Sequence, residues 1–266
     1  MLEMNMQIAV KDVFEGFKKY EFWTIFGANE IKKKYRRSKL GQFWITLSVA
    51  FFVLVVGSLY KNLFGIEDNF YMTYLAIGYV LWQFISGVLN KSGTIFSKNG
   101  KFMLQRSWPA TTFVLWLIYS EILILAHNLL ILIPIFFFWG TWPSIVGVLF
   151  SILGFLITFM TALAVGMILA ITTLRYRDIQ PILKSLVRIA FFATPIIWME
   201  RDLGAVGDLI LAVNPFGYFL HIVRDPLLGF AINPFDWLIA CGIFVVCVLG
   251  ALLLLARTKH RLAYWL

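Results

Sequence analysis

Few residues of this sequence have the types and spacing that catalysis requires. The three histidines lie in separate segments, without a second histidine or a carboxylate at metal-binding spacing: His127, His221 and His260. The pair Gly100-Lys101 is followed by Phe102, so the sequence lacks a phosphate-binding loop for ATP. We therefore expect no metal site, no cofactor and no ATP hydrolysis in this chain.

Two cations within an apolar segment have the spacing of a binding site. Lys184 and Arg188 lie one helical turn apart, and Phe192 continues the same face by one further turn. These cations can simply extend to the cytoplasmic headgroups. Alternatively, they form a basic step that receives an anionic lipid head, where Arg binds phosphate through two parallel hydrogen bonds.

An acidic residue also lies within an apolar run. Glu121 shares a helix face with Asn128, seven residues later. An ionisable group at such a place is costly and suggests a function, for example in a proton-coupled carrier. The alternative is a carboxyl group that faces the interior of a helix bundle and hydrogen-bonds to a neighbouring helix.

The elements that must position these residues are membrane helices. Hydrophobic residues make up 61% of the 266 residues and charged residues 14%, whereas a soluble domain carries about 25% charged residues. Apolar runs recur from Phe43 onward, and each is long enough to cross about 30 Å of hydrocarbon as a helix. The sequence therefore predicts an all-α polytopic membrane protein.

We predict six transmembrane helices, which place both termini on one side: 43–64, 70–90, 110–139, 144–174, 182–199 and 234–256. Twenty of the 23 Lys and Arg residues fall in residues 1–42, in the loops 91–107 and 175–188, and in the tail 257–266. An excess of basic residues marks the cytoplasmic side. Residues 1–42 are then a cytoplasmic segment, 43–256 the transmembrane domain and 257–266 a cytoplasmic tail. This asymmetry explains the net charge of +9 without a nucleic-acid partner.

One segment between the fifth and sixth spans is irregular. Leu209–Val213 and Phe216–Val223 are apolar but are separated by Asn214-Pro215, and neither piece is long enough to cross a bilayer. We expect a re-entrant helical hairpin at about 203–230 that enters from the outer face, shielded by protein or by a water-filled cavity. A pair of amphipathic helices on the surface is the alternative.

The segment before the first span is predicted to be an interfacial amphipathic helix. Aromatic residues fall within one helical arc, and a basic run from Lys32 to Lys39 follows them; the candidate residues are Phe22, Trp23, Phe26, Arg36 and Arg37. Aromatic rings at headgroup depth and cations toward anionic lipid are typical of such a helix on the inner leaflet. A charge cluster that only sets the topology is the alternative, and both roles are compatible.

Four motifs in order resemble one family of transporters. They are Lys34 to Trp44 (KYRRSKLGQFW), Arg175 to Ile179 (RYRDI), Phe191 to Trp198 (FFATPIIW) and the later Asn214-Pro215. Together they resemble the permease subunits of type-2 ATP-binding-cassette exporters of lipid-linked polysaccharide, which include the O-antigen, capsule and teichoic-acid permeases. The resemblance covers nearly the whole chain.

The resemblance implies a homodimer of this chain with two copies of a separate ATPase subunit, which binds ATP and Mg. On that pattern Ser92 to Gln105 forms the helix that couples to the ATPase, with candidate residues Lys98, Lys101, Phe102 and Met103. Leu209 to Val223 forms an outer gate, with candidate residues Asn214, Pro215, Phe216 and Tyr218. The first and fifth spans line the channel, which adds Trp44, Phe52 and Trp198 to Lys184, Arg188 and Phe192.

The implied function is export of a lipid-linked polysaccharide, most similar to O-antigen, across the cytoplasmic (inner) membrane. A hydrophilic polymer cannot cross hydrocarbon and a lipid anchor cannot cross water, so a tunnel with a lateral opening suits both. Aromatic side chains, 17% of the residues, can line such a path or form interfacial belts. One alternative is a type-2 permease for small lipids or drugs. Another is a membrane glycosyl or phosphoglycosyl transferase, although the catalytic cluster that it needs is not visible.

Overall fold

The computed structural model describes residues 2–63, 65–66, 70–105, 108–139, 142–199 and 204–266, and these ranges contain helices and turns but no strand. The prediction of an all-α fold is therefore confirmed. Five helical stretches in these ranges are long and apolar enough to cross a membrane: Phe43–Leu63, Tyr71–Gln105, Ala110–Trp139, Ile145–Arg175 and Pro234–Trp265.

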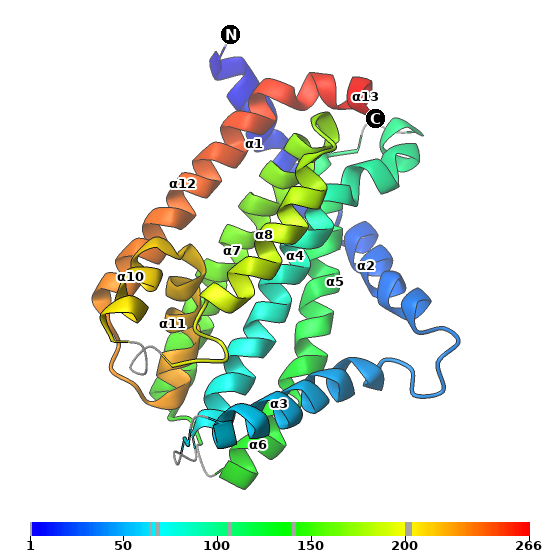
Figure 1. The fold of residues 1–266 in the computed structure, drawn as a ribbon. Coiled ribbons are helices and arrows are strands. Elements are labelled where there is room, and N and C mark those ends of the chain that lie inside the picture. Colours follow the sequence, from blue (N-terminus) through cyan, green and yellow to red (C-terminus); the bar gives the residue numbers. More distant parts are fainter. Residues whose placement is uncertain (1, 64, 67–69, 106–107, 140–141, 200–203) are drawn as a thin grey trace.

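Helix α4 (Tyr71–Gln105) lies at the centre of the bundle (Figure 1). Within its most apolar stretch 78% of the residues are buried, against 28% or less in the other four candidate spans. Its neighbours are α5 (Ala110–Leu129), which continues after a turn into α6 (Leu132–Trp139), and α7 (Ile145–Arg175). Because α4 is surrounded by other helices, its different faces contact different neighbours.

Small residues allow α7 to approach α11 (Pro215–Leu228) closely. A Cβ atom added at Gly147 or Gly154 would collide with a backbone carbonyl group of α11. Between these glycines, the hydroxyl of Ser151 donates a hydrogen bond of 2.7 Å to the carbonyl of Val223. Small residues and hydroxyl groups are the usual means of holding membrane helices together, since lipid tails are as apolar as the helices.

The two ends of the chain meet at one end of the bundle (Figure 1). Asp12 of α1 (Leu2–Lys18) caps α5 by accepting hydrogen bonds from the backbone N–H groups of Ala110 and Thr111. It also forms an ion pair with Lys259, in the turn η1 (Lys259–Arg261) between α12 (Pro234–Thr258) and α13 (Leu262–Trp265). The predicted placement of both termini on one side agrees with this arrangement.

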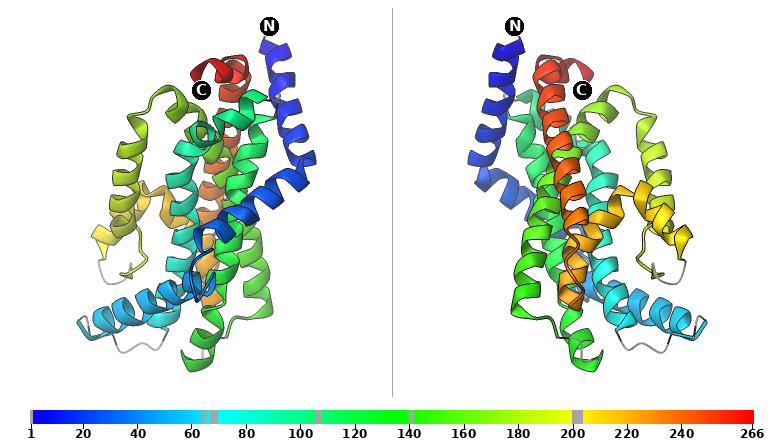
Figure 2. Two further views of the ribbon diagram at one scale, coloured as in Figure 1. Left: turned by 90° about the vertical axis from the view of Figure 1, so that its right-hand side faces the viewer. Right: turned by 90° about the vertical axis from the view of Figure 1, so that its left-hand side faces the viewer.

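Helix α3 (Phe43–Leu63) lies across α4 and α5 at a steep angle, at the end of the bundle away from the termini (Figure 1). Near its start, the hydroxyl of Thr46 donates a hydrogen bond of 2.7 Å to the carbonyl of His127 on α5. Figure 2 shows α3 and α8 (Ile179–Ala193) on the same side of α4. Side chains from all three helices line one groove, described below.

The predicted fifth span differs from the structure in its bounds. Helix α8 begins at Ile179 and ends at Ala193, before Pro195, and 15 residues are too few to count among the candidate spans. Six crossings therefore stay a prediction. The two apolar pieces around Asn214 form α10 (Ala205–Val213) and α11. The predicted loop 91–107 is also partly helical, since α4 continues without a break to Gln105.

Candidate functional site

An open groove of about 600 Å³ lies between α4, α8 and α3. Its walls combine polar and aromatic side chains: Phe52, Tyr79, Trp82, Gln83, Ser86, Asn90, Lys184, Val187, Arg188, Phe191 and Phe192. Four of the residues proposed from the sequence for a substrate channel meet there: Phe52, Lys184, Arg188 and Phe192. The groove thus combines two cations with several flat aromatic faces.

The cationic wall comes from α8. Lys184, Arg188 and Phe192 lie on successive turns of this helix, so the same face brings all three into the groove. The side chains of Lys184 and Arg188 are exposed, and neither forms an ion pair or side-chain hydrogen bond with another residue of the described ranges. Both cations are therefore available to an anion.

The opposite wall is the polar face of α4, which sequence reasoning missed. Gln83, Ser86 and Asn90 follow the helical spacing i, i+3 and i+7. The amide of Gln83 donates a hydrogen bond of 2.6 Å to the hydroxyl of Tyr79. The carbonyl of Asn90 accepts one of 2.8 Å from Gln180, at the start of α8. Three polar residues on one face of an otherwise apolar helix were the signal that could have identified this wall.

Aromatic rings connect the three helices around the groove. Phe52 of α3 stacks on Tyr79 of α4, with ring centroids 3.8 Å apart and an angle of 11° between the planes. Phe191 of α8 contacts both Tyr79 and Trp82 of α4, at centroid distances of 6.2 and 5.9 Å. Trp44 and Trp198, also proposed as channel residues, do not line this groove.

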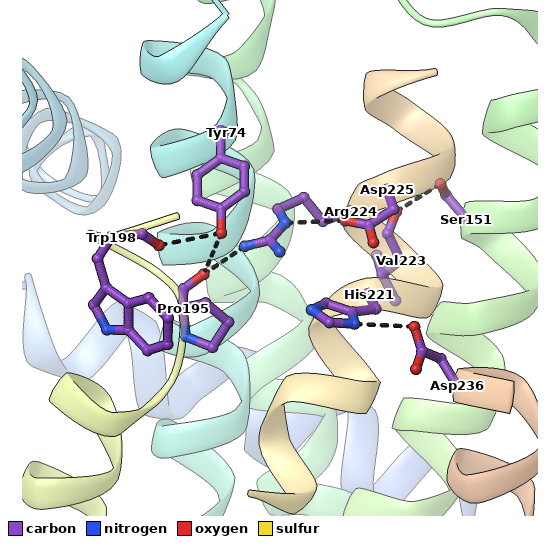
Figure 3. A network of polar contacts seen from close by, with 9 residues as sticks. All are labelled: Tyr74, Ser151, Pro195, Trp198, His221, Val223, Arg224, Asp225 and Asp236. Atoms are coloured by element: carbon purple, nitrogen blue, oxygen red, sulfur yellow. Dashed lines mark hydrogen bonds and ion pairs between the residues drawn. The ribbon is translucent and has the colours of Figure 1, made fainter. Parts of the chain in front are cut away.

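A second polar cluster lies where the chain after α8 meets α4 and α11 (Figure 3). Arg224 of α11 is buried, and its guanidinium group donates a hydrogen bond to the carbonyl of Pro195. The hydroxyl of Tyr74 lies 3.0 Å from the carbonyl of Pro195 and 3.2 Å from that of Trp198. The indole N–H of Trp198 in turn donates to the carbonyl of Phe192, at 2.9 Å. Side chains thus bind backbone carbonyl groups at the end of α8 and in the segment that follows it.

The same cluster joins α11 to α12. The imidazole Nδ1 of His221 lies 3.0 Å from a carboxylate oxygen of Asp236, and both side chains are buried (Figure 3). Together with the bond from Ser151 to Val223, this contact fixes α11 to the two helices behind it. Sequence reasoning did not single out Arg224, His221 or Asp236 for any role of this kind.

The predicted gate residues connect this cluster to the groove. The side chain of Asn214 caps α11 through the N–H of Phe216 and donates a hydrogen bond of 3.0 Å to the carbonyl of Ala193, at the end of α8. Pro215 occupies the first turn of α11, and the hydroxyl of Tyr218 lies 3.5 Å from the carbonyl of Ala212. Phe216 meets the groove residue Trp82 edge to face, with centroids 5.4 Å apart.

The aromatic arc of α2 (Tyr20–Lys34) packs onto α5. Phe22 and Phe26 both contact Trp116, and Trp23 contacts Tyr119. The exposed cations that follow enclose a space of about 410 Å³: Lys33, Lys34, Arg36 and Arg37. The cations have the exposure expected of an interfacial segment. The aromatic rings, by contrast, pack in part against α5.

The predicted coupling residues lie on the last turns of α4. Lys98, Lys101 and Phe102 are exposed, whereas Met103 is partly buried against the core. Phe102 also contacts Phe26 of α2, with ring centroids 5.6 Å apart. Among the described residues, no group of His, Cys, Asp or Glu side chains could hold a metal ion.

Comparison with known proteins agrees with this description. The family model described as ABC-2 type transporter matches residues 21–228. The O-antigen export system permease protein RfbA of Myxococcus xanthus is 26% identical over 188 residues, which cover 70% of this chain and 72% of that protein. Two proteins of the same name from Klebsiella pneumoniae are each 20% identical, over 218 residues (80% of this chain, 83% of that protein) and over 250 residues (92% and 94%).

These matches confirm the prediction of a permease subunit of an ATP-binding-cassette transporter, in which a separate subunit hydrolyses ATP, and they argue against an enzyme. The family match covers well over half of the sequence and includes α3, α4, α8 and the pair α10–α11. The groove and Arg224 with its partners Tyr74 and Pro195 therefore lie within its bounds. This chain belongs to the ABC-2 type transporter family.

Proposed function

We propose that this chain is the channel-forming permease subunit of an ATP-driven exporter that moves a lipid-linked, O-antigen-like polysaccharide across the cytoplasmic membrane. The observation that carries the proposal is the groove, where Lys184 and Arg188 face a wall of aromatic and amide side chains. The names of the relatives, O-antigen export system permease, support the same class of substrate.

The groove suits both parts of such a substrate. A lipid-linked glycan carries phosphate between its sugar and its hydrocarbon chain, and the guanidinium group of Arg188 can bind phosphate through two parallel hydrogen bonds. Sugar rings have apolar faces that flat side chains such as Phe52 and Phe192 can contact. The amide of Gln83 offers hydrogen bonds to hydroxyl groups. Contacts of this kind bind a substrate without changing it chemically, as transport requires.

The proposal includes six crossings, with α8 as the fifth. Its 15 residues reach about 22 Å, short of a hydrocarbon core of about 30 Å. Residues 194–199, which form bends and turns, would complete the crossing. Non-helical backbone is tolerated at such depth where protein shields its polar groups, and the hydrogen bonds of Tyr71, Tyr74 and Arg224 to this segment supply that shielding.

The orientation follows from charge. The end of the bundle that holds both termini also carries the end of α4 and the turn after α7 (Figure 1), and these segments are rich in Lys and Arg. We place this end in the cytoplasm, where two copies of the chain would receive two ATPase subunits that bind ATP and Mg. The pair α10–α11 would then enter from the outer face as a gate.

The test is the response of ATP hydrolysis to substrate. The permease should be purified with its ATPase subunit, reconstituted in liposomes, and given polyprenyl-linked glycan, polyprenyl phosphate without glycan, or small amphipathic drugs. Coupling between two binding sites is reciprocal, so a transported substrate should change the affinity of the ATPase for nucleotide and thereby the rate of hydrolysis at subsaturating ATP. We expect the linked glycan to stimulate hydrolysis most. Stimulation by drugs and not by linked glycan would support a small-molecule permease and overturn the proposal.

A further inference from the structure

Helix α4 separates the groove from a second cavity on its other side. Gln83, Ser86 and Asn90 face the groove. On another face of the same helix, Ile85, Val88 and Leu89 line an apolar cavity of about 220 Å³. The remaining walls come from α7, α11 and α12: Thr158, Thr161, Ala162, Val165, Pro215, Phe216, Phe219, Ile243 and Cys247. One helix therefore divides a polar space from an apolar one at the same height.

The cavity offers little to a polar ligand. Its two hydroxyl groups are bound within their own helix, since Thr158 donates to the carbonyl of Gly154 at 2.9 Å and Thr161 to that of Ile157 at 2.8 Å. The other side chains of the lining are apolar or a thiol. An apolar cavity of about 150 Å³ stays dry and takes up benzene, so this larger space can hold a longer hydrocarbon segment.

Its position suits a lipid tail. Ala162 lies near the middle of α7 and Cys247 near the middle of α12, and both helices are long and apolar enough to cross a membrane. The centre of a membrane-spanning helix lies among lipid tails. A cavity at that height is therefore surrounded by hydrocarbon and far from the headgroups.

An aromatic contact beside α4 lies between the two spaces. Trp82 lines the groove, Phe216 lines the cavity, and their rings meet edge to face at 5.4 Å. Phe216 lies in the first turn of α11, directly after Asn214, whose side chain attaches this helix to the end of α8. Phe216 therefore lies at the boundary between groove and cavity.

We propose that the cavity binds part of the hydrocarbon chain of the substrate's lipid anchor while the phosphate lies against Lys184 and Arg188. The inference rests on the proposed function and extends it, because it assigns the two chemical parts of one substrate to the two sides of α4. Phe216 is then a positioning residue, because its ring lines the cavity that holds the chain and contacts the groove residue Trp82.

Photo-crosslinking of the full chain in phosphatidylglycerol nanodiscs tests this assignment. The probe is a polyprenyl phosphate with a diazirine in its hydrocarbon chain, and the comparison is a phosphatidylglycerol with a diazirine in one acyl chain. We expect the polyprenyl probe to label α7 near residues 158–165 and α12 near 243–247, and unlabelled polyprenyl phosphate to compete. Equal labelling of these segments by the phospholipid probe would show ordinary membrane lipid in the cavity and overturn the proposal.

Filling the cavity gives an independent test. Ala162→Phe should abolish labelling of the cavity and reduce export, and the smaller change Ala162→Leu should reduce labelling in part. Met160→Phe adds bulk on the same helix at a side chain that is 40% exposed, so it should change neither. Size-exclusion profiles identify any variant that fails to fold. Undiminished labelling in a folded Ala162→Phe protein would contradict the assignment.

A third measurement separates this inference from the proposed function. A polyprenyl phosphate with its diazirine next to the phosphate should label the groove near Arg188. If it does, and linked glycan stimulates ATP hydrolysis, while the cavity is not labelled, only the present inference fails. If the groove is not labelled and glycan has no effect on hydrolysis, the proposed function fails with it.

Discussion

The guanidinium group of Arg224 lies over the ring of Tyr74, with its Cζ atom 3.8 Å from the ring centroid. Both side chains also reach the carbonyl of Pro195. A buried charge is tolerated when its partners replace water, and here the partners come from α4, from the chain after α8 and, through Asp225, from α11 itself. This contact therefore fixes the irregular segment 194–199 to two helices.

Two substitutions of Tyr74 should distinguish the contribution of its ring to stability from that of its hydroxyl. Tyr74→Phe removes only the hydrogen bonds of the hydroxyl, at a cost of about 0.5–1.5 kcal/mol. Tyr74→Leu also removes the cation–π contact, which contributes about 2 kcal/mol when it is desolvated, so it should lower the melting temperature of the purified protein further. Equal melting temperatures for the two variants would show that the ring contributes nothing beyond its bulk.

An asymmetric pair of substitutions tests the ion pair between Lys91 of α4 and Glu121 of α5. The side chain of Glu121 is 3% exposed and that of Lys91 is 37% exposed. Lys91→Met leaves a buried carboxylate without its cation and should destabilise by about 3–5 kcal/mol, whereas Glu121→Gln leaves a cation that water can reach. Thermal unfolding in detergent measures both. A larger loss for Glu121→Gln would contradict a structural role and favour a functional carboxylate.

The role of Glu121 shows what local sequence can and cannot give. Its place in an apolar run left open a functional carboxylate or a carboxyl group bonded to a neighbouring helix, and the structure shows a buried side chain paired with Lys91 of α4. The partner, Lys91, is 30 residues away, and nothing in the spacing identifies it. Arg224 is a stronger case, since its partners Tyr74 and Pro195 come from two other segments of the chain.

The groove was predictable in one wall only. Lys184, Arg188 and Phe192 share a helix face by spacing alone, and the structure brings them into one groove. The interfacial role of the aromatic arc of α2 stays a prediction, because the same amphipathic pattern serves a membrane surface or a neighbouring helix. Rings on α5 cover Phe22 and Phe26 here. Which surface an apolar face covers is decided by tertiary packing, which the pattern does not contain.

Substitutions at the end of α4 should uncouple transport from ATP hydrolysis. An exposed ring on a helix end can enter a groove of a partner protein, so Phe102→Ala with Met103→Ala should weaken copurification of the ATPase and reduce export. Phe102 also contacts Phe26. Phe26→Ala therefore serves as the control, because it removes this contact and leaves the exposed end of α4 intact. Equal loss of the ATPase in both variants would assign the effect to the packing of α2.

Single-cysteine labelling tests the orientation of the bundle. Cys241 and Cys247 are the natural cysteines, and both should be replaced by serine. A cysteine at Arg257, near the end that holds the termini, should react only after the membrane is made permeable, because basic ends stay in the cytoplasm. A cysteine at Trp142, between α6 and α7 at the opposite end, is 63% exposed and should react from outside. The reverse pattern would place both termini outside.

The last prediction concerns Arg188, which should matter more for export than for folding. Its side chain is exposed in the groove without an ion pair to another described residue, and a surface substitution of this kind usually changes stability by no more than about 0.5 kcal/mol. Arg188→Lys keeps the charge and loses the planar fork, so it should assemble normally and export weakly. Arg188→Ala should export least.

Ile189→Ala, at the next position and outside the groove lining, is the matched control and should export normally. Surface polysaccharide measured against permease abundance decides the matter, because export that falls only in proportion to abundance would exclude phosphate binding by Arg188.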